Sequence, residues 1–155
     1  MNASGGWPVA ACTVGATGNL IRRATQGDVI RIFEIRNTVH ENKLDDPARV
    51  TVEDVRSFIA DTGMFVWEDA GQVVGFSAAD PRDGSIWALF VDPAHERRGI
   101  GRALFERACA VLWQAGYTRL WLTTDRGTRA ETFYRAAGWE VTATRGNELV
   151  FETVV

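Results

Sequence analysis

The chain has 155 residues, a formal net charge of −3, and hydrophobic and charged shares of 46% and 24%. This length predicts one domain with a sizeable core, and the near balance of charge argues against nucleic acid or an anionic membrane as a partner. No apolar run approaches the roughly 18 residues of a membrane helix, and the N-terminus lacks the basic start of a signal peptide. We therefore expect a cytoplasmic protein.

The cysteines and histidines form no known framework. Cys12 and Cys109 lack disulfide spacing, and Cys109 falls among apolar residues of a predicted helix, which indicates a reduced thiol in the core. Since only His40 and His95 are added to these, the sequence offers no cluster of metal ligands, and we expect no metal.

The chain opens with a segment that carries no structural pattern. Residues 1–19 are rich in Gly, Ala, Ser and Thr and have no periodicity, so we expect a flexible tail there. No linker divides the remainder, which we take as one domain over residues 20–155. Its first predicted element is a short strand over Leu20 to Ala24.

Two helices are predicted next. Thr25 and Asp28 resemble a capping box at the start of the first helix, and Thr51 and Asp54 repeat this signal before the second. Apolar residues follow both signals at helical spacing. A polar, acidic segment, HENKLDDP, separates the two helices.

The pattern changes to strands after Gly63. Three runs with strand character follow, and turn signals separate them: MFVWED, QVVGFSAAD and SIWALFVD. This arrangement predicts an antiparallel meander. A third helix is expected over Arg98 to Ala115, with Gly116 at its C-terminal cap. The strand RLWLTTD comes next, so a strand, a helix and a strand predict a right-handed parallel crossover.

The last predicted elements are a fourth helix and a hairpin. Thr128 and Glu131 form a Thr-x-x-Glu capping box, and apolar residues recur behind them at helical spacing up to Gly138. The hairpin joins WEVTATR to ELVFETVV through a turn at Gly146-Asn147. The chain therefore predicts an α/β domain with a mixed sheet of about six or seven strands and roughly four helices.

The turn before the third helix suits a bound anion. The first N–H groups of a helix lack intrahelical partners, and the helix dipole adds positive charge there. Gly99 and Gly101 leave the backbone open to close approach, and Arg97, Arg98 and Arg102 add charge. A Walker A loop would need Lys-Ser/Thr after the second glycine, and a dinucleotide fingerprint would need a third glycine. We therefore expect this turn to bind a phosphate or diphosphate group of a ligand that neither of these two motifs recognises.

Two stretches together resemble the GNAT N-acetyltransferase superfamily. VDPAHERRGIGRALF is similar to the acyl-CoA-binding motif of that superfamily, Q/R-x-x-G-x-G/A. TRAETFYRAAGWE is similar to its later helix, which carries a Phe-Tyr pair before Gly and an aromatic residue. Two positions depart from the pattern: Glu96 stands at the first place of the motif, and Asp125-Arg126-Gly127 stands where many members have Asn.

The resemblance implies a fold and a co-substrate. It implies the GNAT fold, in which the fourth and fifth strands splay apart at one end, and it implies acetyl-CoA as the co-substrate. The pantetheine arm would then pair with the backbone of Leu89, Phe90 and Val91. The residues implied at the diphosphate are Arg97, Arg98, Gly99, Ile100, Gly101 and Arg102. Free backbone N–H groups in the gap would stabilise a thioester oxyanion.

The implied reaction is direct attack of an amine on acetyl-CoA, and the leaving thiolate needs a proton. We assign this role to Tyr134, because a phenol with a reference pKa of about 10 stays protonated beside a thiol of about 8.5. Periodicity alone would place Tyr134 on the apolar face of its helix. Candidates for the general base are Glu34, Asp80 and His40, with water as another. We expect His95 to be a loop residue or a cofactor contact.

The acceptor is the open part of this interpretation. Superfamily members often line the acceptor site with the connection between the first two helices, where Glu41, Asp45 and Asp46 could attract a cationic amine. A hydrated acidic loop is the simpler interpretation of these carboxylates. Several tryptophans fall at predicted strands, where we expect them to fill the core, with some left as candidates for an apolar acceptor pocket: Trp87, Trp121 and Trp139.

We therefore expect an acetyl-CoA-dependent N-acetyltransferase that acts on a primary amine of a small molecule or a peptide. A second hypothesis is a non-catalytic acyl-CoA-binding or regulatory module of the same fold. A third is a transferase for longer acyl groups or for hydroxyl acceptors. The oligomeric state stays open, although the C-terminal strand ELVFETVV could pair or exchange between two subunits of a homodimer.

Overall fold

The computed structural model of the protein describes residues 19–38, 52–60, 63–95 and 99–154. The predicted tail lies outside these residues apart from Asn19, where the first strand begins. The boundary between tail and domain therefore stays a prediction.

The strands form one mixed sheet of seven strands in the order β1-β2-β3-β4-β5-β7-β6. All neighbouring strands are antiparallel except β4 and β5, which run parallel across the α3 crossover. The strands are β1 (Asn19–Arg23), β2 (Met64–Asp69), β3 (Gln72–Asp80), β4 (Ser85–Val91), β5 (Arg119–Asp125), β6 (Glu140–Arg145) and β7 (Glu148–Val154). This confirms the predicted mixed α/β fold, the antiparallel meander and the parallel crossover.

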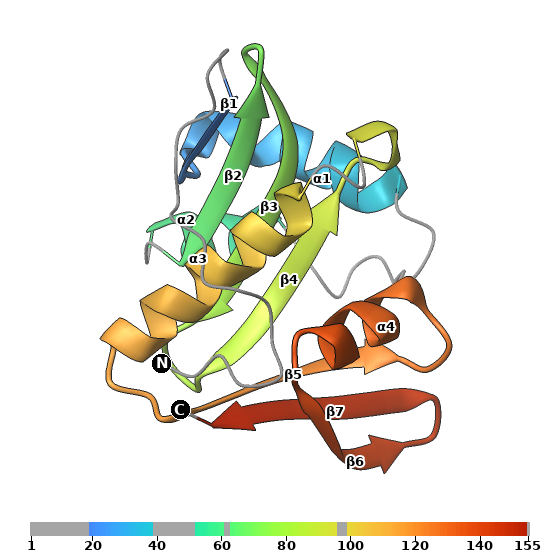
Figure 1. The fold of residues 1–155 in the computed structure, drawn as a ribbon. Coiled ribbons are helices and arrows are strands. Elements are labelled where there is room, and N and C mark those ends of the chain that lie inside the picture. The colour runs from blue at the N-terminus through green and yellow to red at the C-terminus, as the bar shows by residue number, and fades with distance from the viewer. Residues whose placement is uncertain (1–18, 39–51, 61–62, 96–98, 155) are drawn as a thin grey trace.

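Four α-helices of the described chain cover the two faces of the sheet (Figure 1). They are α1 (Val29–Thr38), α2 (Val52–Ala60), α3 (Ile100–Gln114) and α4 (Arg129–Ala136), with short 3-10 segments η1 (Gln26–Asp28) and η3 (Pro93–His95). The first two helices lie on one face, and α3 and α4 lie on the other. None of the helices in the described ranges is long and apolar enough to span a membrane.

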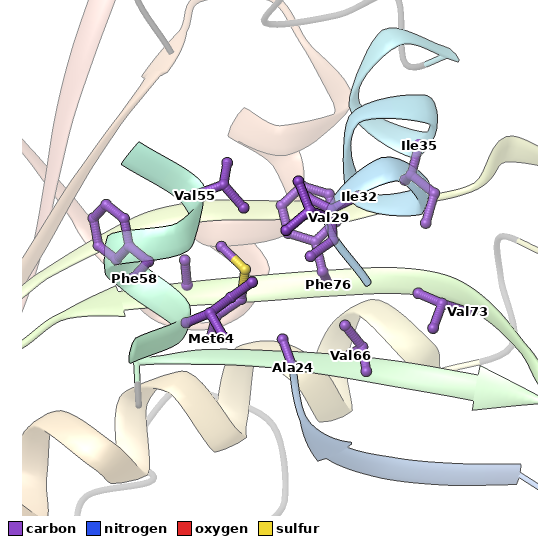
Figure 2. Close-up of a cluster of buried hydrophobic side chains, with 12 residues drawn as sticks. Ala24, Val29, Ile32, Ile35, Val55, Phe58, Met64, Val66, Val73 and Phe76 are labelled. Atoms are coloured by element: carbon purple, nitrogen blue, oxygen red, sulfur yellow. The ribbon is translucent and has the colours of Figure 1, made fainter. Parts of the chain in front are cut away.

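The first part of the core lies between α1, α2 and the sheet. Figure 2 shows side chains from both helices directed toward those of β2 and β3. The largest members with almost no exposed surface are Ile32, Ile35, Val55, Met64 and Phe76. Burying each such side chain contributes about 1.5–3 kcal/mol to folding, so this cluster fixes α1 and α2 against the sheet.

The second part of the core holds α3 and α4 against the opposite face. The ring centroid of Phe105 on α3 lies 5.4 Å from that of Tyr134 and 5.2 Å from that of Trp139. Gly75 lets α3 approach the sheet closely, because a Cβ there would lie 3.0 Å from Cδ1 of Leu104. Cys109 is a free, buried thiol within this part of the core, as predicted.

Two of the three tryptophans expected in the core are only partly buried. Trp139 is buried just before β6, as predicted, but Trp87 and Trp121 are half-buried. The register explains Trp87: Ala78 pairs with Ala88 and the next residue, Ala79, pairs with Ile86, so Trp87 is the extra residue of a β-bulge. The core prediction therefore holds for Trp139 and in part for Trp87, whose ring stacks on Phe58 at 4.1 Å against the first core cluster, while Trp121 is only half-buried.

Candidate active site

The parallel strands β4 and β5 meet at one end only. Their register contains a single pair, Ser85 with Trp121, next to a hydrogen bond of 3.2 Å from the Trp121 amide to the Gly84 carbonyl. The indole N–H of Trp121 also donates to the Asp83 carbonyl, at 3.0 Å. The strands then diverge toward their carboxyl ends, which lead to α3 and α4 (Figure 1). This confirms the predicted splay and leaves the last residues of β4 without β5 as a partner.

The start of α3 lies beside the diverging end of β4. Gly99 is the N-terminal cap residue with φ +77°, a left-handed conformation that favours glycine. The first intrahelical bond runs from the Ala103 amide to the Gly99 carbonyl, at 3.1 Å. The amides of Ile100 and Gly101 precede it and so have no intrahelical acceptor, and no side chain of the described residues caps this end. Arg97 and Arg98, also predicted here, lie outside the described residues.

Gly101 brings three elements together. A Cβ at Gly101 would lie 3.6 Å from Cγ2 of Val91 on β4 and 3.9 Å from Cε1 of Phe133 on α4. Leu89, Phe90 and Val91 are all half-buried, and they divide between the two faces of the sheet. Leu89 and Val91 face α3, and Phe90 faces α1, with its ring 5.4 Å from that of Phe76.

Tyr134 lies on α4 within an aromatic cluster. Its ring is 5.3 Å from Phe133 and 5.7 Å from Phe151, and the residue is only 7% exposed. Burial, and secondarily the nearby Cys109 thiol, raises the pKa of Tyr134 well above its ordinary value. No residue of the described chain hydrogen-bonds its hydroxyl. The group is therefore a neutral phenol that has a proton to donate.

The start of α4 differs in one detail from the predicted capping box. The Thr128 hydroxyl accepts from the Glu131 amide at 3.3 Å, as expected. The Glu131 carboxylate, however, accepts from the Gly127 amide at 2.7 Å, one residue before the position that the box requires. Gly127 has φ +81°, which turns its N–H toward that carboxylate. Two hydrogen bonds, one to the Thr128 hydroxyl and one to the Glu131 carboxylate, thus fix the turn from β5 into α4.

The described base candidates lie away from the diverging strands or are already engaged. Asp80 pairs with Ser85 at the closed end of the β4–β5 gap. Its carboxylate accepts two bonds from the Arg82 side chain, at 2.9 and 3.0 Å, and these lower the pKa of Asp80. Glu34 is largely exposed and lies 3.4 Å from Arg31. His40 lies outside the described residues.

His95, predicted to be a loop residue or a cofactor contact, lies in the short 3-10 segment between β4 and α3. It ends η3, and its Nε2 lies 3.9 Å from an Asp69 carboxylate oxygen at the end of β2. The acidic residues of the predicted acceptor loop, Glu41, Asp45 and Asp46, lie outside the described residues.

Thr124 is a candidate that the sequence interpretation missed. It is 6% exposed, and its Oγ1 has no hydrogen-bond partner among the described residues. Strand alternation places it on the same face as the buried Leu120 and Leu122, near the end of β5 that has left β4. Unpaired buried hydroxyls are rare in folded proteins, so this one suits a bound polar group. The sequence signal was a threonine in the apolar register of RLWLTTD.

These features fit an acyl-CoA and do not form a metal centre. The backbone at Gly101 and the amides of Ile100 and Gly101 offer polar partners beside the diverging end of β4. Among the residues that the structure describes, no group of three His, Cys, Asp or Glu side chains gathers to hold a metal ion.

A mixed sheet that parts between two parallel strands, beside the start of α3, is the arrangement that the resemblance to the GNAT superfamily implied. The profile of the Acetyltransferase (GNAT) family matches residues 29–139. The chain therefore belongs to the GNAT acetyltransferase family.

Solved structures show the same fold at low sequence identity. The PaiA N-acetyltransferase from Thermoplasma acidophilum, in complex with coenzyme A, is 15% identical with a TM-score of 0.70, over 88% of this chain and 99% of that one. YncA from Salmonella typhimurium, with its cofactor acetyl-CoA, is 19% identical with a TM-score of 0.72, over 88% and 93%. A ribosomal-protein-alanine N-acetyltransferase from Brucella melitensis is 22% identical with a TM-score of 0.69, over 88% and 99%.

Proposed function

We propose that this acetyltransferase moves the acetyl group of acetyl-CoA to a primary amine by direct attack within a ternary complex. The observation that carries the proposal is the gap between β4 and β5, which opens beside the uncapped start of α3. Two structures of the same fold hold coenzyme A or acetyl-CoA, which supports the choice of co-substrate.

The co-substrate would extend from the start of α3 into the gap between β4 and β5. We assign its diphosphate to the amides from Gly99 to Arg102, with Arg97 and Arg98 as further contacts. The pantetheine arm would pair with the free edge of β4 at Leu89–Val91, as an added strand does. The Thr124 hydroxyl, which no described residue engages, would hydrogen-bond a polar atom of the arm.

The chemistry follows from those positions. The amine nitrogen attacks the thioester carbonyl carbon, and backbone N–H groups in the gap stabilise the oxyanion. The C–S bond then breaks, and Tyr134 gives its proton to the leaving thiolate. The attacking nitrogen loses a proton to water or to a base that is still to be assigned. The products are an N-acetyl amine and free coenzyme A.

A binding measurement and a thiol-release assay test the proposal together. Calorimetry should detect one coenzyme A per chain, and acetyl-CoA should release thiol faster when an amine is added. Tight binding without acceptor-stimulated release would instead support a non-catalytic acyl-CoA-binding module. Faster release from longer thioesters or with hydroxyl acceptors would redirect the substrate assignment. Absence of coenzyme A binding would contradict the proposal as a whole.

Two further expectations belong to the same proposal. We propose a cytoplasmic location, which the supply of acetyl-CoA favours. The strand β7 has no free edge to pair with a second subunit, because it is already paired with β5 and with β6. A dimer formed by strand pairing would use an outer strand of the sheet, β1 or β6.

A further inference from the structure

An arginine interrupts the apolar face of α1. Val29, Ile32 and Ile35 are buried, and they point from α1 toward the sheet in Figure 2. At about 100° per residue, the direction of position 36 falls between those of Val29 and Ile32. Arg36 therefore stands where one more apolar residue would continue the buried face.

Arg36 is half-buried, and the described residues give it no partner. Neither an ion pair nor a hydrogen bond joins it to any residue of the described chain, and burial alone lowers its pKa. Arg31, also half-buried on α1, is the opposite case. It donates to an Asp92 carboxylate oxygen at 2.9 Å and to the Val73 carbonyl at 2.7 Å. A guanidinium that is partly removed from water is unfavourable without an anion, so Arg36 has the character of a binding group.

The position of Arg36 relates it to the transfer site. Phe33, one turn earlier, packs at the border of the first core cluster, as Phe90 of β4 also does. The helix α1 lies beside the carboxyl end of β4 in Figure 1, and the side chain of Arg31, in its first turn, pairs with Asp92 directly after that strand. This face of the sheet is opposite to α3, which the proposal gives to coenzyme A. A second substrate can therefore approach the thioester from the side of Arg36.

We propose that Arg36 binds the carboxylate of the acceptor, and that the acceptor is a free amino acid with an apolar side chain. A planar guanidinium matches a carboxylate through two parallel hydrogen bonds. The half-buried rings of Phe33 and Phe90 offer apolar surface to the acceptor side chain. This assignment rests on the proposed amine acetylation and specifies the substrate class of the same site.

Matched acceptors test the assignment. Leucine, methionine and phenylalanine should be acetylated with a kcat/KM at least about tenfold above that of their C-terminal amides, since a hydrogen-bonded charge contributes about this much. Arg36→Gln should bring the ratio of acid to amide close to one. Arg36→Lys should keep part of the preference, and Arg36→Glu should reverse it. The KM for acetyl-CoA should stay unchanged in all three variants.

The control is Arg56→Gln, which removes the same charge from an exposed arginine of α2 that lies 3.8 Å from Glu53. It should leave the ratio unchanged. Arg36→Gln should melt at the same temperature or higher, because it removes a half-buried charge that no described residue pairs. Equal loss toward acids and amides with a lower melting temperature would overturn the assignment, since the arginine stem would then act only in packing. Equal use of acids and amides by the unaltered protein would overturn it too, while acetylation of neither would contradict the proposed function itself.

Discussion

The ring of Tyr134 packs against four aromatic side chains. Its hydroxyl has no hydrogen-bond partner among the described residues. Tyr134→Phe keeps the ring and removes only the proton donor. We expect kcat to fall by about 10²-fold, in the range of general acid catalysis. Coenzyme A affinity should change by less than about twofold, because the substitution removes no contact that the cofactor makes before the reaction. Stopped-flow thiol release and calorimetry measure the two quantities.

The chain supplies a matched control in its other tyrosine. The Tyr117 hydroxyl donates to the Pro81 carbonyl at 2.8 Å, at the closed end of the β4–β5 gap. Tyr117→Phe should therefore lower the free energy of unfolding by about 1 kcal/mol and leave kcat unchanged. If Tyr134→Phe kept full kcat, another group or a water would have to protonate the thiolate. Because burial raises the pKa of Tyr134, its ionisation should not limit the rate at neutral or mildly alkaline pH.

Gly101 allows a test that separates shape from charge. Gly101→Ala adds a Cβ at ordinary contact distances of 3.6 and 3.9 Å, so the fold should accept it and gain up to about 1 kcal/mol of helix propensity. Gly101→Asp adds the same Cβ and a carboxylate beside the proposed diphosphate. We expect it to weaken coenzyme A binding by at least about tenfold through charge repulsion. Equal affinity of the two variants in calorimetry would remove the diphosphate from the start of α3.

At the scale of elements, local signals were enough to predict most of the fold. The runs MFVWED and QVVGFSAAD coincide with β2 and β3, and the capping box of Thr25 and Asp28 is present in full. These features depend on neighbours in sequence, which alternation and capping describe. The bulge at Trp87 depends on the register between β4 and β3. The unpaired hydroxyl of Thr124 depends on how β5 diverges from β4. Such non-local features need the assembled sheet.

The junction of β1, η1 and α1 makes a pH-dependent contribution to stability. Burial alone would raise the pKa of Asp28, but hydrogen bonds from Arg22 and from the Thr25 amide outweigh it and lower that pKa. A lowered pKa means that the stabilisation is complete above the ordinary value of 3.8 and is lost as the pH falls below it. Asp28→Asn should therefore cost about 2 kcal/mol at pH 7.

Urea unfolding at several pH values checks this expectation. The difference between Asp28→Asn and the unaltered protein should be constant from neutral pH down to about 5 and should shrink below about 4. The control is Glu53→Gln, since Glu53 is exposed on α2 and its pair with Arg56 is 3.8 Å long. It should change stability by less than about 0.5 kcal/mol. A difference that is independent of pH would show that Asp28 acts through packing alone.

At the scale of the whole molecule, the sheet consists of two parts that are joined weakly by backbone. The strands β1 to β4 form one antiparallel part, β5 to β7 form the other, and a single register pair links them. Side chains of α3 complete the connection, because Phe105, Ala108 and Leu112 pack with β5, α4 and β7. A ligand in the gap would therefore touch both parts, and its binding should be visible in backbone dynamics.

Hydrogen exchange measured by mass spectrometry tests this consequence. Saturating coenzyme A should slow exchange in peptides that cover Leu89–Val91 and the first turn of α3, because the arm pairs the free edge of β4 and the diphosphate accepts from the helix amides. The hairpin of β2 and β3 should not change, since it is already paired along its length. Adenosine 3′,5′-bisphosphate keeps one phosphate of the diphosphate but lacks the pantetheine arm, so it should leave Leu89–Val91 unprotected. Protection by both ligands alike, or protection spread evenly over the chain, would mean that coenzyme A does not enter between β4 and β5.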